Sequence, residues 1–273
     1  MRNLGRYLTL AAAGLGGCLA QAEERGPAEQ VLVVRANEFR FDAVDSVRAG
    51  RVRVRLQNDG MMPHHLQLLR LEPGHGAAEV LARAERGELV IPEARFMGGP
   101  AIPPVGGASE VLVTLPPGRY LMVCYMPAGK SRHLTMGMAR ELVVVPSPGG
   151  QDAPVHDDIR IVLTSYRFEL SAPITAGRRV LRIENLVQEP HEVDIVRLLP
   201  GRSATDLDLW LSAPQGPPPF AAAGGSMVLD RGQVTWATID FTPGLYALIC
   251  FVPDTRDQRP HTAHGMVRVL TVD

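Results

Sequence analysis

The chain has 273 residues, with 28 Lys and Arg against 29 Asp and Glu, so its formal net charge is -1. This length suits one large domain or two ordinary ones, and 45% apolar residues exclude a disordered chain. No block of Lys or Arg stands out, which excludes nucleic acid and anionic surfaces as the main partner.

The first residues resemble the export signal of a bacterial lipoprotein. Arg2 and Arg6 precede the apolar run YLTLAAAGLGG, which is too short to span a bilayer but suits a signal-peptide core. The run ends in LGGC, a match to the lipobox, whose cysteine receives the lipid and becomes the new N-terminus. We therefore predict a signal peptide over 1–18, lipidation of Cys18 and a tether over 19–30.

The resemblance implies an exported protein, held to a bacterial membrane by a lipid anchor and facing the periplasm or the cell exterior. The alternative is an ordinary signal peptide, cut after Ala20 or Ala22. The mature protein is exported in both cases.

The next hundred residues have the pattern of β-strands with one helix among them. VLVVRANEFRF (31–41) is rich in β-branched and aromatic residues, and GRVRVRLQN (50–58) alternates apolar residues with Arg, as half-buried strands do. A short helix follows, with one apolar face made of Ala77, Val80, Leu81 and Ala84. A Pro-Gly turn then precedes a strand that ends at Cys124, and ELVVV closes the unit at residue 145.

The second half repeats this order after a linker rich in Pro and Gly. RVRLQNDGMMPHHLQLLRL (53–71) aligns with VLRIENLVQEPHEVDIVRLLPG (180–201), and LPPGRYLMVC (115–124) aligns with FTPGLYALIC (241–250). The offset is 127 residues at Pro-His and 126 at Cys, so a whole domain is duplicated. We predict two antiparallel β-sandwiches over 31–145 and 158–273, joined by a linker over 146–157. A capping box at Ser203 and Asp206 is predicted to start the second helix.

The duplication also bears on whether the cysteines form a disulfide. With Cys18 assigned to lipid, only Cys124 and Cys250 remain. Two cysteines in an exported protein suggest a disulfide. These two occupy equivalent places in separate cores, which do not generally lie within bonding reach, and we favour two unbridged cysteines.

Each half resembles a cupredoxin, the small β-sandwich of blue copper proteins. NDGMMPHHLQL is similar to the plastocyanin stretch in which Asn, Gly and Pro-His precede an apolar strand. GRYLMVC and GLYALIC match the strand Gly-x-Tyr-x-x-x-Cys, and HLTMGM and HTAHGM match the ending His-x-x-x-Gly-Met. The resemblance covers nearly all of 31–145 and 158–273. It implies an all-β fold of two tandem Greek-key β-sandwiches, each with a short helical insertion.

The same resemblance implies a type 1 copper site in each half. Such a site needs two imidazoles, one thiolate and a weak axial thioether. The implied ligands are His64, Cys124, His133 and Met138 in the first half, and His191, Cys250, His261 and Met266 in the second. Met136 and His264, which also precede or flank the Gly-Met pairs, are the alternative axial ligands. His65, His75, His156 and His264 have no equivalent partner, and we expect them to be solvent-facing or in loops.

The ligand loops also limit the chemistry. Residues 124–138 fit the form Cys-x8-His-x4-Met of the type 1 loop in copper nitrite reductases, whereas the second loop is two residues longer and is expected to bulge into solvent. Those reductases and the multicopper oxidases hold further copper through a histidine directly before Cys and through His-x-His pairs. No His-x-His occurs here. The other positions where that family has ligands hold apolar residues: Val123, Ile249, Leu69 and Val196.

We therefore expect no enzyme, but an exported one-electron carrier with a redox protein of the cell envelope as partner and an exposed imidazole edge as the electron exit. A copper storage or delivery protein and a copper-free interaction module of the envelope are the alternatives. Tyr120 and Tyr246, in the Gly-x-Tyr turns, are expected to be structural corners.

Overall fold

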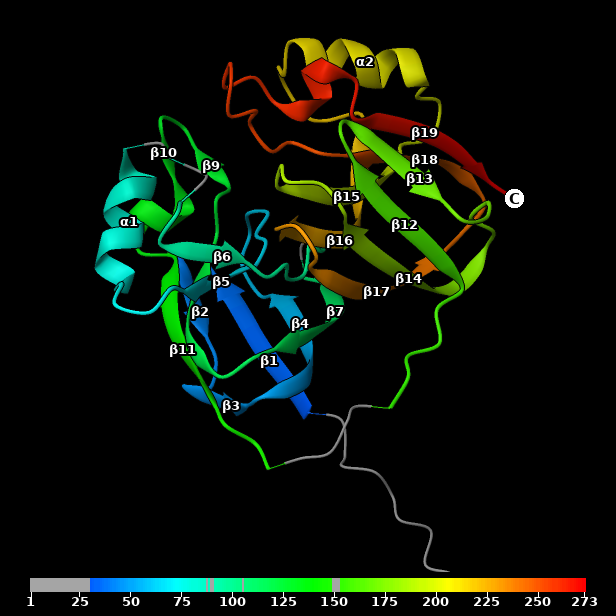
Figure 1. Ribbon diagram of the computed structural model, residues 1–273. Coiled ribbons are helices and arrows are strands. Elements are labelled where there is room, and N and C mark those ends of the chain that lie inside the picture. Colours follow the sequence, from blue (N-terminus) through cyan, green and yellow to red (C-terminus); the bar gives the residue numbers. More distant parts are fainter. Residues whose placement is uncertain (1–29, 87, 89–90, 105, 149–152) are drawn as a thin grey trace, which may run out of the picture.

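The computed structural model describes residues 30–86, 88, 91–104, 106–148 and 153–273. Two β-sandwiches stand side by side (Figure 1), which confirms the predicted all-β fold. The predicted signal peptide, the lipidation site at Cys18 and nearly all of the tether lie outside the described residues. None of the helices in the described part of the chain is long and apolar enough to cross a membrane.

The first sandwich contains two facing layers of strands. One layer runs β2-β1-β4-β7 and the other β3-β11-β8-β5-β6, and a short hairpin lies beside them. The first layer comprises β1 (Gln30–Asn37), β2 (Arg40–Asp42), β4 (Gly50–Asn58) and β7 (Ala108–Leu115). The second comprises β3 (Ser46–Arg48), β5 (Gln67–Leu71), β6 (Ala94–Phe96), β8 (Gly118–Val123) and β11 (Ala139–Val145), and the hairpin is β9 (Pro127–Ala128) with β10 (Ser131–Arg132).

The second sandwich repeats the plan. Its layers run β13-β12-β14-β17 and β16-β15-β18-β19. The first layer comprises β12 (Ile159–Thr164), β13 (Arg167–Leu170), β14 (Gly177–Asn185) and β17 (Val234–Phe241). The second comprises β15 (His191–Leu198), β16 (Phe220–Leu229), β18 (Gly244–Ile249) and β19 (Val267–Val272).

One helix interrupts each sandwich, as predicted. Helix α1 (Ala77–Glu85) buries Ala77, Val80 and Ala84 on one face. Helix α2 (Ala204–Ser212) begins with the predicted capping box, in which the Ser203 hydroxyl accepts a hydrogen bond from the Asp206 amide and the Asp206 carboxylate accepts one from the Ser203 amide. Short 3-10 helices η1 (His133–Met136) and η2 (His261–His264) lie in the two predicted ligand loops.

The prediction of purely antiparallel sandwiches is wrong in one respect. Strands β1 and β4, and their counterparts β12 and β14, run parallel, and β3 and β11 are also parallel. A parallel pair needs a crossover connection, and between β1 and β4 the chain visits the opposite layer as β3. The alternation of apolar residues along the sequence shows which face of a strand is buried but not the direction of its neighbour.

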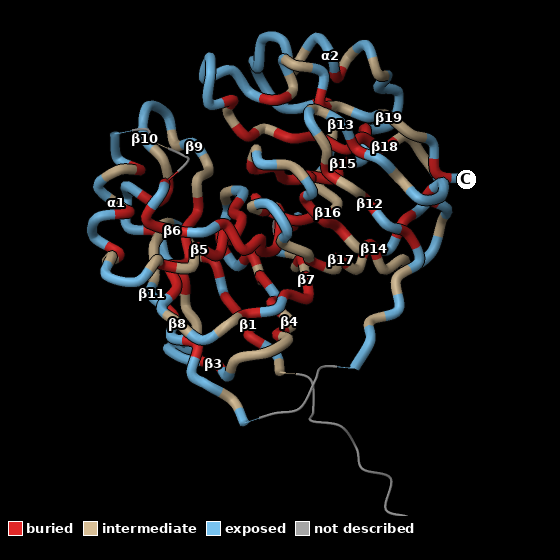
Figure 2. The backbone as a smooth tube through the Cα atoms, in the orientation of Figure 1, coloured by how far each residue is buried: buried red, intermediate tan, exposed pale blue. Residues whose placement is uncertain are grey.

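The two sandwiches are also not separate. Strand β7 pairs antiparallel with β17, so the inner layers form one eight-stranded sheet through both halves. Isolated bridges between Met97 and Leu229 and between Pro100 and Ser226 extend the contact, and the Phe96 amide donates to the Asp230 carboxylate at 2.9 Å. We call this contact the seam. Buried backbone runs through both lobes and across it (Figure 2).

A glycine pair next to the seam recurs in both halves. A Cβ atom on Gly99 would lie 2.0 Å from the Leu66 carbonyl oxygen, and one on Gly225 would lie 2.0 Å from that of Val193. Both glycines have positive φ, 142° and 123°. No residue other than glycine fits so close an approach at these backbone angles. The stretches FMGG and AAGG therefore impose the same close backbone contact in both halves.

Candidate metal centres

The first predicted histidine of each half is positioned by an asparagine at the end of a strand. Asn58 ends β4; its amide nitrogen donates to the Met62 carbonyl, and its oxygen accepts from the Gly60 amide. Asn185 ends β14 and makes the equivalent bonds to Glu189 and Val187. Asn and Asp commonly fold a tight turn in this way, and each turn leads directly into Pro-His.

The other three predicted ligands of each half lie in one loop that is closed by backbone hydrogen bonds. In the first half the Cys124 amide donates to the Met138 carbonyl at 3.2 Å, and the Met138 amide donates to the His133 carbonyl at 3.0 Å. In the second half Cys250, Met266 and His261 make the same two bonds at 3.3 and 3.0 Å. The extra length of the second loop therefore leaves the ligand-bearing ends unchanged.

The structure brings two histidines and one cysteine together in each half. The Nδ1 atoms of His64 and His133 lie 3.1 Å apart, and the Cys124 sulfur is 3.6 Å from the His133 Nδ1. In the second half the Nδ1 atoms of His191 and His261 lie 3.0 Å apart. The Cys250 sulfur is 3.4 Å from one of these nitrogens and 3.9 Å from the other.

These donor sets fit copper of type 1. Ligands at about 2 Å for nitrogen and about 2.3 Å for sulfur, spread around one ion in a plane, stand roughly 3.5 Å from one another, and the donor atoms here all lie within 4.8 Å of one another. Both groups are fully or almost fully buried, and each presents two imidazole nitrogens and one sulfur to a common point. Two imidazoles with a thiolate are the donors that suit this class of site.

The pKa values of the histidines and cysteines show which side chains must lose a proton before copper can bind. Burial raises the pKa of Cys124 to about 12, and burial also raises that of Cys250. Burial, helped by His133, lowers the pKa of His64 to about 4, and burial with His261 lowers that of His191 to about 3. The imidazoles are thus neutral and ready to coordinate at neutral pH, whereas each thiol must release a proton to the solvent.

Burial separates the alternative axial ligands. Met138 and Met266 are fully buried at the ends of the ligand loops, whereas Met136 is 44% exposed. His264 lies half-buried, with its Nε2 3.3 Å from the Asp257 carboxylate. The arrangement favours Met138 and Met266.

Aromatic rings cover the second histidine of each site, which contradicts the expected exposed imidazole edge. Phe39 packs edge-on to His133 and Tyr166 packs edge-on to His261, each with ring centroids 5.1 Å apart. Both aromatic residues have a φ of 60°, a strained value for a bulky side chain. They occupy equivalent places in the turns after β1 and β12. His133 and His261 are buried as a result, so neither imidazole edge reaches the surface.

The prediction for His65 is wrong, because this side chain is buried. Its Nε2 accepts a hydrogen bond of 2.8 Å from the amide of Tyr125, the residue after Cys124. In the second half Glu192 takes the same position, and its carboxylate accepts from the amide of Phe251 at 2.9 Å. An alignment of the two copies places His65 and Glu192 at the same position. Because one is a histidine and the other a glutamate, the alignment does not predict that both accept the same hydrogen bond.

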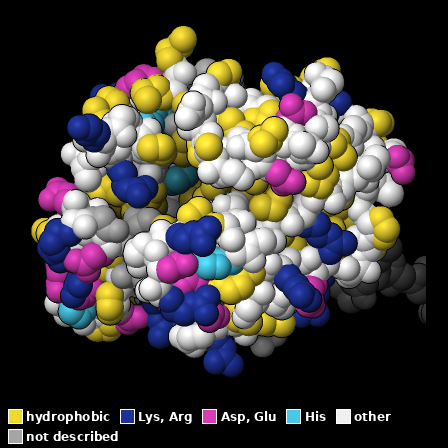
Figure 3. Space-filling view, turned by 90° about the horizontal axis from the view of Figure 1, so that it is seen from above, with side chains coloured by type: hydrophobic (Ala, Val, Ile, Leu, Met, Phe, Trp, Pro, Cys, Tyr) yellow, Lys and Arg dark blue, Asp and Glu magenta, His cyan; other side chains and the backbone are white. Residues whose placement is uncertain are grey.

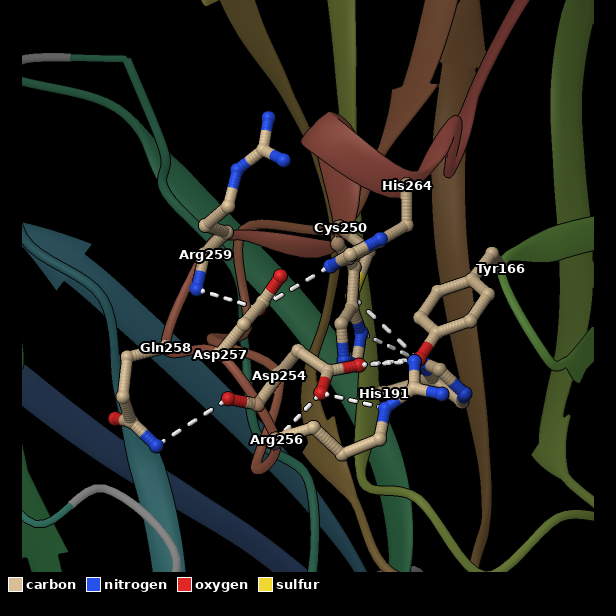
Figure 4. A network of polar contacts seen from close by, with 10 residues as sticks. Tyr166, His191, Cys250, Asp254, Arg256, Asp257, Gln258, Arg259 and His264 are labelled. Carbon is tan, nitrogen blue, oxygen red and sulfur yellow. Dashed lines mark hydrogen bonds and ion pairs between the residues drawn. The ribbon is translucent and has the colours of Figure 1, made fainter.

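The longer second loop is anchored and only its tip is exposed. Asp254 is buried, accepts a hydrogen bond from the Tyr166 hydroxyl and forms a 2.9 Å ion pair with Arg256 (Figure 4). Asp254, Asp257 and His264 together resemble a metal-binding cluster. Their carboxylates already accept from Arg256, Tyr166 and the Arg259 amide, so the cluster is explained as the structural closure of this loop.

The structure also describes the tyrosines, cysteines and other residues that the sequence singled out. The Tyr120 hydroxyl donates to the Pro116 carbonyl at 2.8 Å, and the Tyr246 hydroxyl accepts from the Thr242 amide, so both tyrosines form corners. Cys124 and Cys250 are free. His75 pairs with Glu79 and His156 is exposed, as expected. Apolar side chains at Val123, Ile249, Leu69 and Val196 are buried and offer no metal ligand.

Comparisons with known proteins gave matches only among solved structures. No family model matches the chain, and no curated protein matches it. Reduced auracyanin from Roseiflexus castenholzii is 22% identical over 44% of this chain and 100% of its own, with a TM-score of 0.33. A copper-containing nitrite reductase from Thermus scotoductus is 14% identical over 90% of this chain and 61% of its own, with a TM-score of 0.24. A multicopper oxidase from Pseudomonas thermotolerans is 16% identical over 91% and 68%, with a TM-score of 0.25.

Proposed function

We propose that this chain, both of whose halves are cupredoxin-type β-sandwiches, is an exported copper protein that transfers single electrons. The observation that carries the proposal is the convergence of two histidine nitrogens and one cysteine sulfur in each half, all within 4.8 Å of one another. The proposal includes a lipid anchor at Cys18 and a redox protein of the cell envelope as partner.

The surroundings of the sites favour electron transfer over conversion of a substrate. When bound there, copper would supply a centre that alternates between two oxidation states one electron apart. The loops that hold the donors are tied by backbone bonds, so the side chains are kept in place in either state. The histidine nitrogens that face away from the cysteines, Nε2 of His64, His133 and His191, are buried without a hydrogen-bond partner among the described residues. No open position faces solvent at these atoms.

The test uses the chain from residue 19, which retains every described residue, loaded with Cu(II). We expect two copper ions per chain and an intense visible absorption from thiolate-to-copper charge transfer that disappears on reduction and returns on oxidation. Cys124→Ser should remove the part of this absorption that comes from the first site, and Cys250→Ser the part that comes from the second. A chain that binds no copper in stoichiometric amount and stays colourless contradicts the proposal.

The same preparation distinguishes electron transfer from copper delivery. Because the donor atoms are buried, we expect copper to stay bound for hours against a weak chelator. Full loss within minutes, with the absorption otherwise present, would favour delivery to another protein.

A further inference from the structure

A cavity of roughly 650 Å³ lies between the two halves, next to the seam. Figure 3 looks down on this side of the molecule, where hydrophobic side chains gather around a hollow. The wall is mainly aromatic and aliphatic, and its largest side chains are Phe96, Tyr125, Trp210, Phe220 and Phe251. A cavity of this size holds a small organic molecule.

The wall is built from equivalent positions of the two copies. Pro63 and His65 face it from the first half, and Pro190 and Glu192 from the second. Tyr125 and Phe251, which directly follow the two cysteines, also line it. Residues directly next to predicted ligands of both candidate metal centres in the sequence therefore line the cavity.

The polar groups on this wall are unequal between the halves. Glu192 and Asp194 alternate along β15 and so point to the same side, into the cavity. Asp194 is only 8% exposed, and its carboxylate has no hydrogen bond or ion pair with any residue that the structure describes. Its counterpart in the first half is Gln67, which instead donates across the seam to the Val228 carbonyl at 3.1 Å.

Among the residues that the structure describes, no cation on the wall pairs with either carboxyl group. The guanidinium of Arg132, which also lines the cavity, donates to the Tyr125 carbonyl at 3.2 Å, and forms no ion pair with either acid. His65 accepts from the Tyr125 amide and is kept neutral, since burial lowers its pKa to about 3. A buried carboxylate without a partner is costly, and its natural complement is a positive charge carried on an apolar body. Aromatic side chains on the same wall favour a cation as well.

We propose that the cavity is a binding site for a hydrophobic amine, with the ammonium group at Asp194 and the apolar body among the aromatic side chains. This site is distinct from the metal centres, and its occupation does not depend on copper.

The test uses dansylcadaverine, an aromatic body with a five-carbon chain that ends in a primary amine, and N-pentyldansylamide, which has the same body and chain without the terminal amine. Binding to the chain from residue 19 is measured by titration calorimetry near pH 8, with and without copper. We expect one site per chain for dansylcadaverine and a Kd at least tenfold weaker for N-pentyldansylamide. Asp194→Asn should weaken dansylcadaverine about tenfold and leave N-pentyldansylamide unchanged, whereas Asp208→Asn, on the exposed side of α2, should change neither.

A second variant tests the place of binding. Ala222 lies on the cavity wall, and Ala222→Trp should fill the space and abolish binding of both compounds, while circular dichroism shows the chain folded. Equal affinity for the two compounds, binding that survives Ala222→Trp, or no binding of dansylcadaverine to the unaltered chain would each overturn the proposal. Because the copper-free chain is measured too, failure of the copper assignment leaves this test intact.

Discussion

The residue after each first histidine carries the same hydrogen bond with different chemistry. His65 and Glu192 both accept from the amide that follows the cysteine. A neutral imidazole fixes the first loop, whereas a buried carboxyl group fixes the second and raises the pKa of Cys250 further, after burial itself. The two centres therefore differ in their electrostatic surroundings although their ligand sets are the same.

The axial position can be tested by a matched pair of methionines. Met138→Leu removes a buried sulfur at the end of the ligand loop, and we expect a shift in the visible absorption and a higher reduction potential of the first site, because a weak donor is lost. Met136→Leu changes an exposed side chain two residues away and should alter neither. Spectroscopy and redox titration of the two variants make the comparison, and an equal effect of both would rule out Met138 as the axial ligand.

The buried Asp194 predicts a dependence of stability on pH. Burial raises its pKa from 3.8 to about 7, so between these values the folded chain holds a proton that the unfolded chain has released. The contribution of this group is full below about pH 4 and is lost as the pH rises through about 7. Asp194→Asn lacks this loss.

We therefore expect the free energy of unfolding of Asp194→Asn, relative to the unaltered chain, to rise between pH 4 and 7 by up to a few kcal/mol, since one pKa unit is about 1.4 kcal/mol. Urea denaturation of the copper-free chain at several pH values measures it, with Asp208→Asn as the control. A difference that stays constant over this range would contradict the buried, unpartnered position of Asp194.

At the residue scale the sequence predicted which two histidines and one cysteine come together in each half, because the motifs of the resemblance and their repetition at a fixed offset can be read from the sequence. It did not predict Phe39 and Tyr166 as covers, although both occupy equivalent turns. Their contact with His133 and His261 crosses between separate loops, and a phenylalanine or tyrosine in a turn carries no signal of what lies beneath it.

At the scale of elements, the two glycine pairs act as a structural joint. The close approach of Gly99 to the Leu66 carbonyl, and of Gly225 to that of Val193, lets the chain pass over the segment that follows the first histidine of each half. A glycine pair in the sequence signals a turn, but it does not show which backbone comes close to it.

Alanine at either glycine should therefore be strongly destabilising. Gly99→Ala and Gly225→Ala both place a methyl group against a carbonyl oxygen at a positive φ, and we expect each to cost about 3 kcal/mol or more. Gly76→Ala, where nothing lies within 4 Å of the added atom, is the control and should cost less than about 1 kcal/mol. Thermal or urea unfolding decides, and equal costs at all three sites would show that the close approach is not present.

The second ligand loop was predicted to bulge because of its length and charge. Only its tip does so, since Asp254 is buried and tied to Tyr166 and Arg256. A run of charged residues is typical of a solvated loop. The Tyr166 hydroxyl that binds Asp254 lies 88 positions away in the sequence, and composition does not reveal pairing between residues so far apart.

At the scale of the whole molecule, the seam makes one folding unit of two repeats. The eight-stranded sheet passes through both halves, and the core is continuous across it. The sequence predicted two sandwiches and a linker because each repeat is complete by itself. The pairing of β7 with β17 depends on how the surfaces of the two halves fit each other. The periodicity of the sequence does not describe this fit, so the joint sheet was not predicted.

We expect the two halves to unfold together. Calorimetry of the copper-free chain should show a single transition, and cutting an engineered protease site within the 146–157 linker should leave both halves together in gel filtration. Two separate transitions, or halves that elute apart after cleavage, would mean that the seam contributes little.

The register of the seam has a consequence for how the molecule arose and diverged. Val111 pairs with Ala237, and Pro100 bridges to Ser226, and in both pairs the partners are the same position of the repeat, 126 residues apart. Equivalent residues that face each other are the mark of a two-fold axis, as in a homodimer. The chain thus has the geometry of a symmetric dimer fused into one polypeptide. A true homodimer must place identical side chains on both sides of its axis. Fusion removes that constraint, and so one wall of the shared cavity carries His65 and the other Glu192.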